Sequence, residues 1–271
     1  MKKLILSLLI ILTFNCFCLF AQTSVKIEPY KFGETLTYEG KFSKAVLRGI
    51  AFVDLNFTVQ KAPDGRNYLI KSEAKSKGSL IKLFGYKFYQ NIQSTVDAER
   101  LQILKTVKRD DQGERVRDSE AVFDYASRKV TYVETDPNDA ARPPRRVASP
   151  IINNTQDLVS AIYTVRYLPL AVGKTFEVAV SDSGLVYKVP VRVTAREQQK
   201  SILGKIWCYR VEPEIFGANR IVEEKDGKMI LWITDDARRI PVRTQISASI
   251  GKVEVKLKEV KFVSENAAPK R

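Results

Sequence analysis

Histidine is absent from all 271 residues of the chain. Without an imidazole the protein cannot form a Ser-His-Asp triad, a Cys-His pair or a zinc site with histidine ligands. It also lacks the side chain that most often exchanges protons near neutral pH. Catalysis would have to depend on carboxylate, lysine or tyrosine groups, so the composition favours a protein that is not an enzyme.

Cysteine is scarce, with only Cys16, Cys18 and Cys208. The first two lie in a predicted export signal, so Cys208 would stand alone in the mature chain and no intramolecular disulfide could form. Its surroundings, KIWCYRVEP, have the pattern of a strand, and no histidine is present to activate the thiol. We therefore expect Cys208 to be a buried packing residue.

Glycine-rich phosphate-binding motifs and calcium-loop spacings are also missing, so we predict no cofactor and no metal site. Adjacent acidic pairs occur at Asp110/Asp111, Glu223/Glu224 and Asp235/Asp236. Neighbouring side chains on a strand point to opposite faces, and each pair sits beside a turn signal. We interpret the pairs as turn residues and predict no catalytic residue.

The first 21 residues have the pattern of a secretory signal. Lys2 and Lys3 precede an apolar run from Leu4 to Leu12, and Ala21 provides a cleavage position. Cleavage would lower the formal charge from +14 to +12 and place the mature chain in the periplasm. A basic exported protein suits peripheral contact with an anionic membrane surface, whereas export argues against nucleic acid as a partner.

Most of the mature chain alternates between apolar and polar residues, as half-buried strands do. Eleven such segments are GETLTYEGKF, IAFVDLNFTVQ, NYLIKSEAKS, KFYQNIQSTV, EAVFDY, KVTYVE, KTFEVAV, VYKVPVRVTA, IWCYRVEPEI, MILWIT and IPVRTQISASI. Their number and spacing predict a mainly β protein, built from a strongly curved antiparallel sheet that forms a half-barrel or a double sheet.

One segment has helical spacing instead. From Thr155, a suitable N-cap, apolar residues recur at Leu158, Ala161, Ile162, Val165 and Leu168. This predicts one principal helix at 155–168, packed on the sheet by its apolar face. The proline-rich stretch 136–154 before it is expected to be an irregular connection or lid.

These elements predict one β-rich domain at 22–265, with two β halves joined by the loop 136–154 and the helix, and a disordered tail at 266–271. DAERLQI at Asp97, DARRIPV at Asp236 and the looser DYASRKV at Asp124 share the order Asp, Ala and a basic residue. Because aspartate starts turns by accepting backbone N–H groups, we expect three similar hairpin corners here.

The segment GSLIKLFGYKFYQ at 78–90 concentrates apolar and aromatic side chains between lysines. As a loop leading into a strand it could line or gate an apolar cavity, or touch a lipid surface. Ordinary core packing is the alternative. The candidate ligand-lining or gating residues are Leu80, Ile81, Leu83, Phe84, Tyr86 and Phe88.

Several motifs together resemble the domain of unknown function 3108 family of exported bacterial proteins. They are PYKFGETLTYEG, SKGSLIKLF, VDAERLQIL, NTQDLVSAIYTVRYLPLAVGKTF, WCYRVEPE and LWITDDARRIPVR, in that order over residues 28–262. The resemblance implies an exported protein and transfers no catalytic residue.

More remotely, the hairpin of Trp232, Asp235 or Asp236, Pro241 and Arg243 resembles one in the periplasmic lipoprotein-carrier superfamily. That resemblance implies a strongly curved antiparallel sheet around helices, with lipid chains held in the concavity. The chain departs from the pattern in length, in having one clear helix and in the insertion at 136–154.

Three functions remain open from the sequence. The first is non-enzymatic binding of a hydrophobic or amphipathic, lipid-like envelope ligand. The second is a structural or interaction module that meets an envelope protein. The third is a carboxylate-based hydrolase, which needs two facing carboxyl groups.

Overall fold

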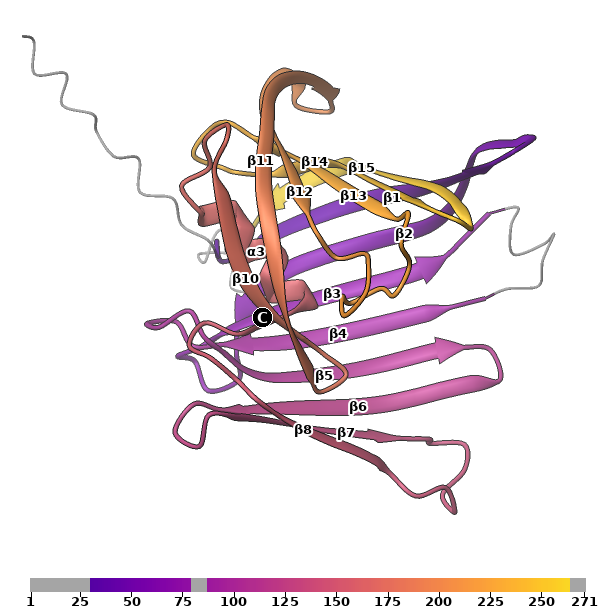
Figure 1. Ribbon diagram of the computed structural model, residues 1–271, viewed down its shortest axis with the longest axis vertical. Helices are drawn as coiled ribbons and strands as arrows, with labels where there is room; N and C mark the ends of the chain where they lie inside the picture. The colour runs from indigo at the N-terminus through magenta and orange to yellow at the C-terminus, as the bar shows by residue number, and fades with distance from the viewer. Residues whose placement is uncertain (1–29, 79–86, 264–271) are drawn as a thin grey trace, which may run out of the picture.

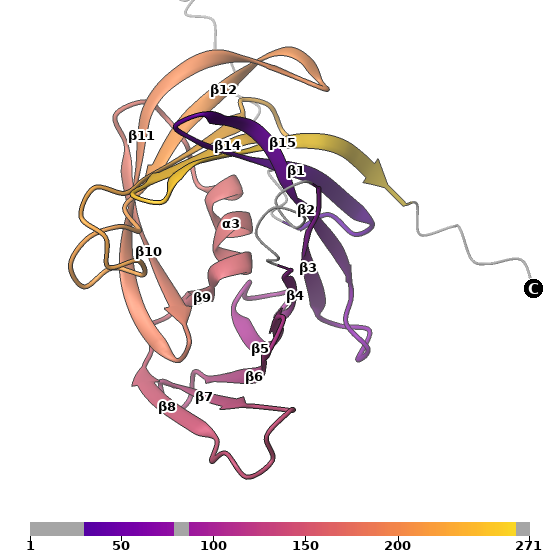
Figure 2. The ribbon, with the colours of Figure 1, turned by 90° about the vertical axis from the view of Figure 1, so that its right-hand side faces the viewer.

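The computed structural model describes residues 30–78 and 87–263. Within them, fifteen strands form a single sheet in the order β8-β7-β6-β5-β4-β3-β2-β1-β15-β14-β13-β12-β11-β10-β9. The sheet coils around one helix, α3, which lies in its concavity (Figures 1 and 2). The mainly β fold with a strongly curved antiparallel sheet is therefore confirmed.

The strands fall into two arms that meet where β1 pairs with β15. The first arm contains β1 (Glu34–Lys44), β2 (Leu47–Lys61), β3 (Tyr68–Ser76), β4 (Tyr89–Val96), β5 (Ile103–Gln112), β6 (Arg115–Asp124), β7 (Lys129–Thr135) and β8 (Arg145–Pro150). The second contains β9 (Gln156–Asp157), β10 (Thr175–Asp182), β11 (Leu185–Ser201), β12 (Gly204–Pro213), β13 (Lys228–Thr234), β14 (Pro241–Ala248) and β15 (Gly251–Phe262). Helix α3 (Leu158–Tyr167) lies between β9 and β10 in the chain.

Successive strands pair as antiparallel neighbours along both arms, and only the short β9 pairs in parallel, with β10. The crossing from β8 to β9 carries the chain to the opposite edge of the sheet. The curvature of the sheet then brings its two ends near each other, so that β8 approaches β11. The sheet is thus a half-barrel whose hydrogen-bonded ladder stays open.

Gly184, in the β10–β11 turn, shows how closely the two arms approach. Its φ is +83°, and a Cβ atom there would lie 2.6 Å from the Cβ of Tyr132 and 2.9 Å from that of Val147. These residues belong to β7 and β8 on the other arm. A side chain at position 184 would push the arms apart, so glycine is required by both backbone conformation and space.

All eleven predicted strands are present, and the structure adds four that were not predicted: β5, β8, β9 and β15. β5 and β15 are rich in charged residues, which obscured the apolar–polar alternation by which the other strands were predicted. The prediction of an irregular connection at 136–154 is wrong for 145–150, which forms β8 opposite β7. Pairing with an existing sheet edge overrode the weak local propensity of RRVASP.

The predicted helix 155–168 is shorter in the structure, and Thr155 is not its N-cap. Asp157 caps α3, where its carboxylate accepts from Ser160 N at 2.6 Å and Ser160 Oγ accepts from Asp157 N at 3.0 Å. The Thr155 hydroxyl instead bonds the backbone of Ile152. β9 occupies the two residues before the helix, so α3 begins only at Leu158.

The three expected hairpin corners are confirmed. The Asp97 carboxylate accepts from the N–H groups of Glu99 and Arg100, and Asp124 accepts from those of Ala126 and Ser127. Asp236 accepts from Arg238 N at 3.0 Å. Each corner then contains one non-glycine residue with positive φ, at Leu101, Arg128 and Arg239 respectively.

Two clusters of buried apolar residues include residues of α3, with Val159 and Tyr163 in one and Val165 in the other. Among the described residues, none of the helices is both long enough and apolar enough to cross a membrane. Cys208 is fully buried in β12, as expected for a packing residue.

Candidate ligand-binding site

Helix α3 presents its predicted apolar face to the second arm of the sheet. Leu158, Ala161, Ile162 and Val165 face the strands β10 to β13. Ala161 and Ile162 are only half-buried, although the helix lies inside the half-barrel (Figure 2). Their remaining exposure is to hollow space between the helix and the sheet.

One hollow, the β10 chamber, has a volume of about 220 Å³. Its lining is apolar throughout, and the strand side chains alternate inward, as the buried Val189 and Val191 do on β11. The lining residues are Leu158, Ala161, Ile162, Val165, Val178, Val180, Val189, Val191, Val211, Pro213, Ile215, Ile221, Met229 and Leu231.

A second hollow, the β1 chamber, adjoins Ile162, Tyr163 and Arg166 of the helix and also has a volume of about 220 Å³. Its lining is mostly apolar and comes from α3 and both arms of the sheet. The lining residues are Leu36, Tyr38, Leu55, Phe57, Ile162, Tyr163, Arg166, Met229, Leu231, Pro241, Thr244, Ile246 and Val255.

The two chambers share Ile162, Met229 and Leu231 as lining residues. These three apolar side chains, one from the helix and two from β13, therefore lie between the two chambers. Each is somewhat below the volume of a typical small-molecule pocket, about 300–1,000 Å³, and together they fall within that range. The arrangement suits apolar chains rather than a polar substrate.

Two polar side chains of the β1 chamber, Tyr163 and Arg166, come from the C-terminal half of α3. Arg166 forms a bidentate ion pair with Glu34 of β1, and the two side chains are 2% and 0% exposed. The Tyr163 hydroxyl is buried and has no hydrogen-bond partner among the described residues. Burial raises the pKa of Tyr163, so this hydroxyl remains a neutral donor and acceptor beside the apolar space.

Arg166 also holds the hairpin corner that contains the two aspartates. Its Nε donates to the carbonyl of Arg239 at 3.0 Å, and its Nη2 donates to that of Arg238 at 3.1 Å. The corner was predicted from the sequence, but its contact with the helix was not. The LWITDDARRIPVR hairpin therefore fixes one end of α3.

The other end of α3 is fixed by Asp157. In addition to capping the helix, its carboxylate accepts from Thr106 Oγ1 at 2.6 Å and from Ser94 Oγ. A small pocket of about 50 Å³ adjoins these groups. Since each carboxylate oxygen is already bonded, Asp157 serves as the point where the helix is attached to β4 and β5.

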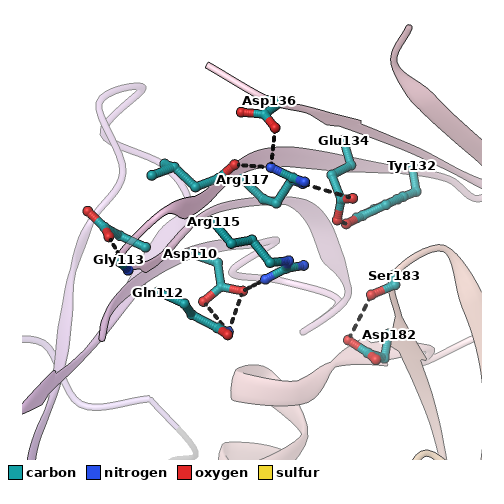
Figure 3. Close-up of polar contacts among 12 residues, drawn as sticks. Asp110, Gln112, Gly113, Arg115, Arg117, Tyr132, Glu134, Asp136, Asp182 and Ser183 are labelled. Atoms are coloured by element: carbon teal, nitrogen blue, oxygen red, sulfur yellow. Dashed lines mark hydrogen bonds and ion pairs between the residues drawn. The ribbon is translucent and has the colours of Figure 1, made fainter. Parts of the chain in front are cut away.

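Figure 3 shows that Asp110, Glu134 and Asp136 pair with arginines, whereas Asp182, which lines this pocket, accepts from Ser183 Oγ at 3.5 Å. Asp110 accepts from Gln112 and, at 3.0 Å, from Arg115 Nη1, while Arg117 lies between Asp136 and Glu134. In the described part of the chain, every carboxyl group whose pKa is shifted is shifted downward. A general acid needs the opposite direction, so these groups lend the hydrolase hypothesis no support.

The predicted ligand-lining segment is tested little by the structure. Leu80, Ile81, Leu83, Phe84 and Tyr86 lie outside the described residues. Phe88 is half-buried just before β4, where its backbone N–H donates to Ser76 Oγ and its carbonyl accepts from Ser76 N, and it does not line either chamber. For these six residues a ligand-lining or gating role stays a prediction.

Sequence reasoning missed Met229, Leu231 and the inward residues of β1, β2 and β14 as cavity-lining groups. Their signal is present in the strand alternation, which assigns each residue to a face. It does not say whether that face is filled by a neighbour or left hollow, because this depends on where α3 lies. Only the helix residues were named in advance as a packing face.

Comparison with solved structures shows the same type of fold elsewhere. A β-barrel-like protein of domain of unknown function DUF1849 from Brucella abortus has a TM-score of 0.59 and 10% identity, over 87% of this chain and 99% of that one. The hypothetical protein CT021 from Chlamydia trachomatis has a TM-score of 0.35 and 8% identity, over 89% and 93% respectively, which is too weak to inform the fold.

No curated protein matches the sequence. A family model described as "Protein of unknown function (DUF3108)" matches residues 36–258, from the buried Leu36 of β1 to Lys258 of β15. This match spans both arms of the sheet, α3 and both chambers. The chain therefore belongs to the DUF3108 family.

Proposed function

We propose that this is an exported cell-envelope protein that binds the apolar part of a lipid-like ligand between α3 and the concave face of the sheet. The observation that carries the proposal is the pair of apolar chambers that share Ile162, Met229 and Leu231. A concave apolar site with a few polar groups is the usual form of a small-molecule binding site.

The charge and the predicted signal support the envelope location. The mature chain would carry a formal charge of +12, which favours contact with anionic envelope surfaces. The predicted signal itself lies outside the described residues. Periplasmic location with cleavage after Ala21 therefore stays part of the proposal, and N-terminal sequencing of the exported protein would test it.

The attachments of α3 also support a binding role. The helix is held at its two ends by Asp157 and Arg166, while Ala161 and Ile162 between them border hollow space. A helix that served only to fill the core would be expected to pack tightly along its whole apolar face, because protein interiors are close-packed. Here the fixed ends hold the chambers open.

Native mass spectrometry of protein purified from its own periplasm, followed by lipid extraction, tests the proposal. We expect a bound molecule with at least one long apolar chain. Repeated recovery of protein without any such molecule, under conditions that preserve non-covalent complexes, would contradict the proposal. Recovery of one dominant envelope protein by crosslinking in cells would favour the interaction module instead.

The Ile162→Trp variant provides a matched test, because an indole at this position would fill space in both chambers. It should retain the fold, by circular dichroism and urea unfolding, and carry much less ligand than the wild type. Val172→Trp is the control, since Val172 is 56% exposed and lines neither chamber. If Ile162→Trp fails to fold, the smaller Ala161→Leu change should reduce binding in the β10 chamber alone.

A further inference from the structure

The ladder between β12 and β13 ends before either strand does. β12 continues to Pro213 and β13 begins at Lys228, yet their last pair is Val211 opposite Leu231. The neighbouring ladders, β11 with β12 and β13 with β14, continue along the same stretch. The sheet is therefore locally parted along one line, which we call the β12–β13 seam.

Pro213 and Met229 border this seam. Both line the β10 chamber on the concave side, and both also line a separate groove of about 340 Å³, which we call the outer groove. Met229 lines the β1 chamber as well, so it stands at the junction of all three hollows. Methionine is unbranched and flexible, which allows it to adapt to a chain passing beside it.

The outer groove opens on the convex side of the sheet. On β11 the exposed Arg192 alternates with the buried Val191 and Val193, whose side chains point into the concavity. Unlike the chambers, the groove is lined by polar and apolar residues in similar number. Its charged and hydroxyl lining residues are Arg192, Thr194, Glu212, Glu214, Arg220 and Lys228.

Charges of both signs alternate in this groove. Glu214 pairs with Arg192 and, at 3.3 Å, with Arg220, while Glu212 pairs with Lys228 at 2.8 Å. The guanidinium groups can bind a phosphate through paired hydrogen bonds, and the carboxylates can accept from an ammonium group. A head group that carries both charges would exchange these internal pairs for external ones without leaving a charge unpaired.

We propose that an amphiphile with a zwitterionic, phosphate-containing head lies across the β12–β13 seam, with its head in the outer groove and its apolar chains in the chambers. This inference rests on the proposed function and adds a head-group site to it. The two chambers on either side of Ile162 would accommodate two chains of one ligand.

Binding of lysophosphatidylethanolamine, compared with a monoacylglycerol of the same chain, tests the head-group site. Both probes are measured by isothermal titration calorimetry below their micelle concentrations. The wild type should bind the phosphate-containing probe about tenfold or more tightly, since hydrogen bonds to charged groups contribute this much. Arg192→Gln should remove most of this difference and leave monoacylglycerol binding unchanged.

Arg196→Gln is the matched control. Arg196 lies on the same strand as Arg192 and also pairs with a carboxylate, Asp235, but a register shift between Val193 and Ala195 places it on the other face, and it does not line the groove. It should leave both affinities unchanged. Equal wild-type affinity for the two probes would overturn the head-group site while the proposed function stands. No binding of either probe would overturn both.

Photocrosslinking tests the passage through the seam. A diazirine on the head of the probe should label β11, β12 and the connection 214–227, whereas one at the end of the acyl chain should label α3 and β10. Labelling of the same peptides by both probes, or of β5 to β8 by the head probe, would contradict the proposed orientation.

Discussion

Arg166 of α3 and Glu34 of β1, which are 132 positions apart, form a fully buried bidentate ion pair. Nη1 lies 2.5 Å from Oε1 and Nη2 lies 2.8 Å from Oε2. The same guanidinium bonds the carbonyl groups of Arg238 and Arg239. One side chain thus joins the helix, the first strand and the hairpin corner, which come from three distant parts of the chain.

Removing either partner of this pair should strongly destabilise the protein. Glu34→Leu or Arg166→Leu alone should lower the free energy of unfolding by about 3–5 kcal/mol, because each leaves an uncompensated buried charge. The double variant should cost less than the sum of the two, which urea unfolding measures. Lys105→Ala is the control, because its pair with Glu120 is exposed and contributes about 0–1 kcal/mol. A loss of unfolding free energy smaller than that caused by Lys105→Ala would contradict the assignment of Glu34 and Arg166 as a buried ion pair.

Asp236→Ala should lower stability rather than ligand binding. Its Oδ1 accepts from Arg238 N at 3.0 Å and from Thr234 Oγ1 at 2.8 Å, so the hairpin corner would lose bonds that set its shape. We expect a loss of about 1–2 kcal/mol by urea unfolding. Affinity for lysophosphatidylethanolamine should be unchanged. An unchanged melting temperature with lost binding would show that the corner has a direct functional role.

Glu39 predicts a pH dependence of stability. The hydrogen bond from Lys77, together with Lys258, lowers the pKa of Glu39 from 4.5 to about 2. Because the folded pKa is depressed, this stabilisation is present above pH 4.5 and is lost as the pH falls towards 2. The difference in unfolding free energy between wild type and Glu39→Gln should therefore be largest near neutral pH and shrink through this window. A constant difference across it would refute this explanation.

Cys208 should be unreactive in the folded protein. Its side chain is fully buried, and burial raises the pKa of the thiol to about 12, so almost no thiolate forms at mildly alkaline pH. A disulfide reagent such as Ellman's should label the chain beginning at Gln22 only after denaturation. Rapid labelling of the folded protein would mean that β12 opens readily or that the thiol is exposed.

Local patterns in the sequence were sufficient for the elements themselves. Alternation placed eleven strands, and the spacing of Leu158, Ala161, Ile162 and Val165 placed the helix and its packing face. Aspartate at three corners predicted three hairpin turns. These features were predictable because each depends on residues a few positions apart, where backbone geometry and side-chain period act directly.

The start of the helix and β8 were misjudged because tertiary contacts overrode local preference. Asp157 caps α3 partly because Ser94 and Thr106 hold its carboxylate, and 145–150 becomes a strand because β7 offers it an edge. Neither partner is near in sequence. Local propensity alone could not have ranked Asp157 above Thr155 as the cap.

The sequence by itself determined the absence of histidine chemistry, the mainly β composition, the helix within 155–168 and the aspartate corners. The tertiary structure alone decided that β1 meets β15, that Arg166 reaches Glu34, that apolar space remains on both sides of Ile162 and that β12 parts from β13. The reason is physical. A strand's pattern fixes which side chains share a face, whereas long-range pairing and the position of α3 decide what that face encloses.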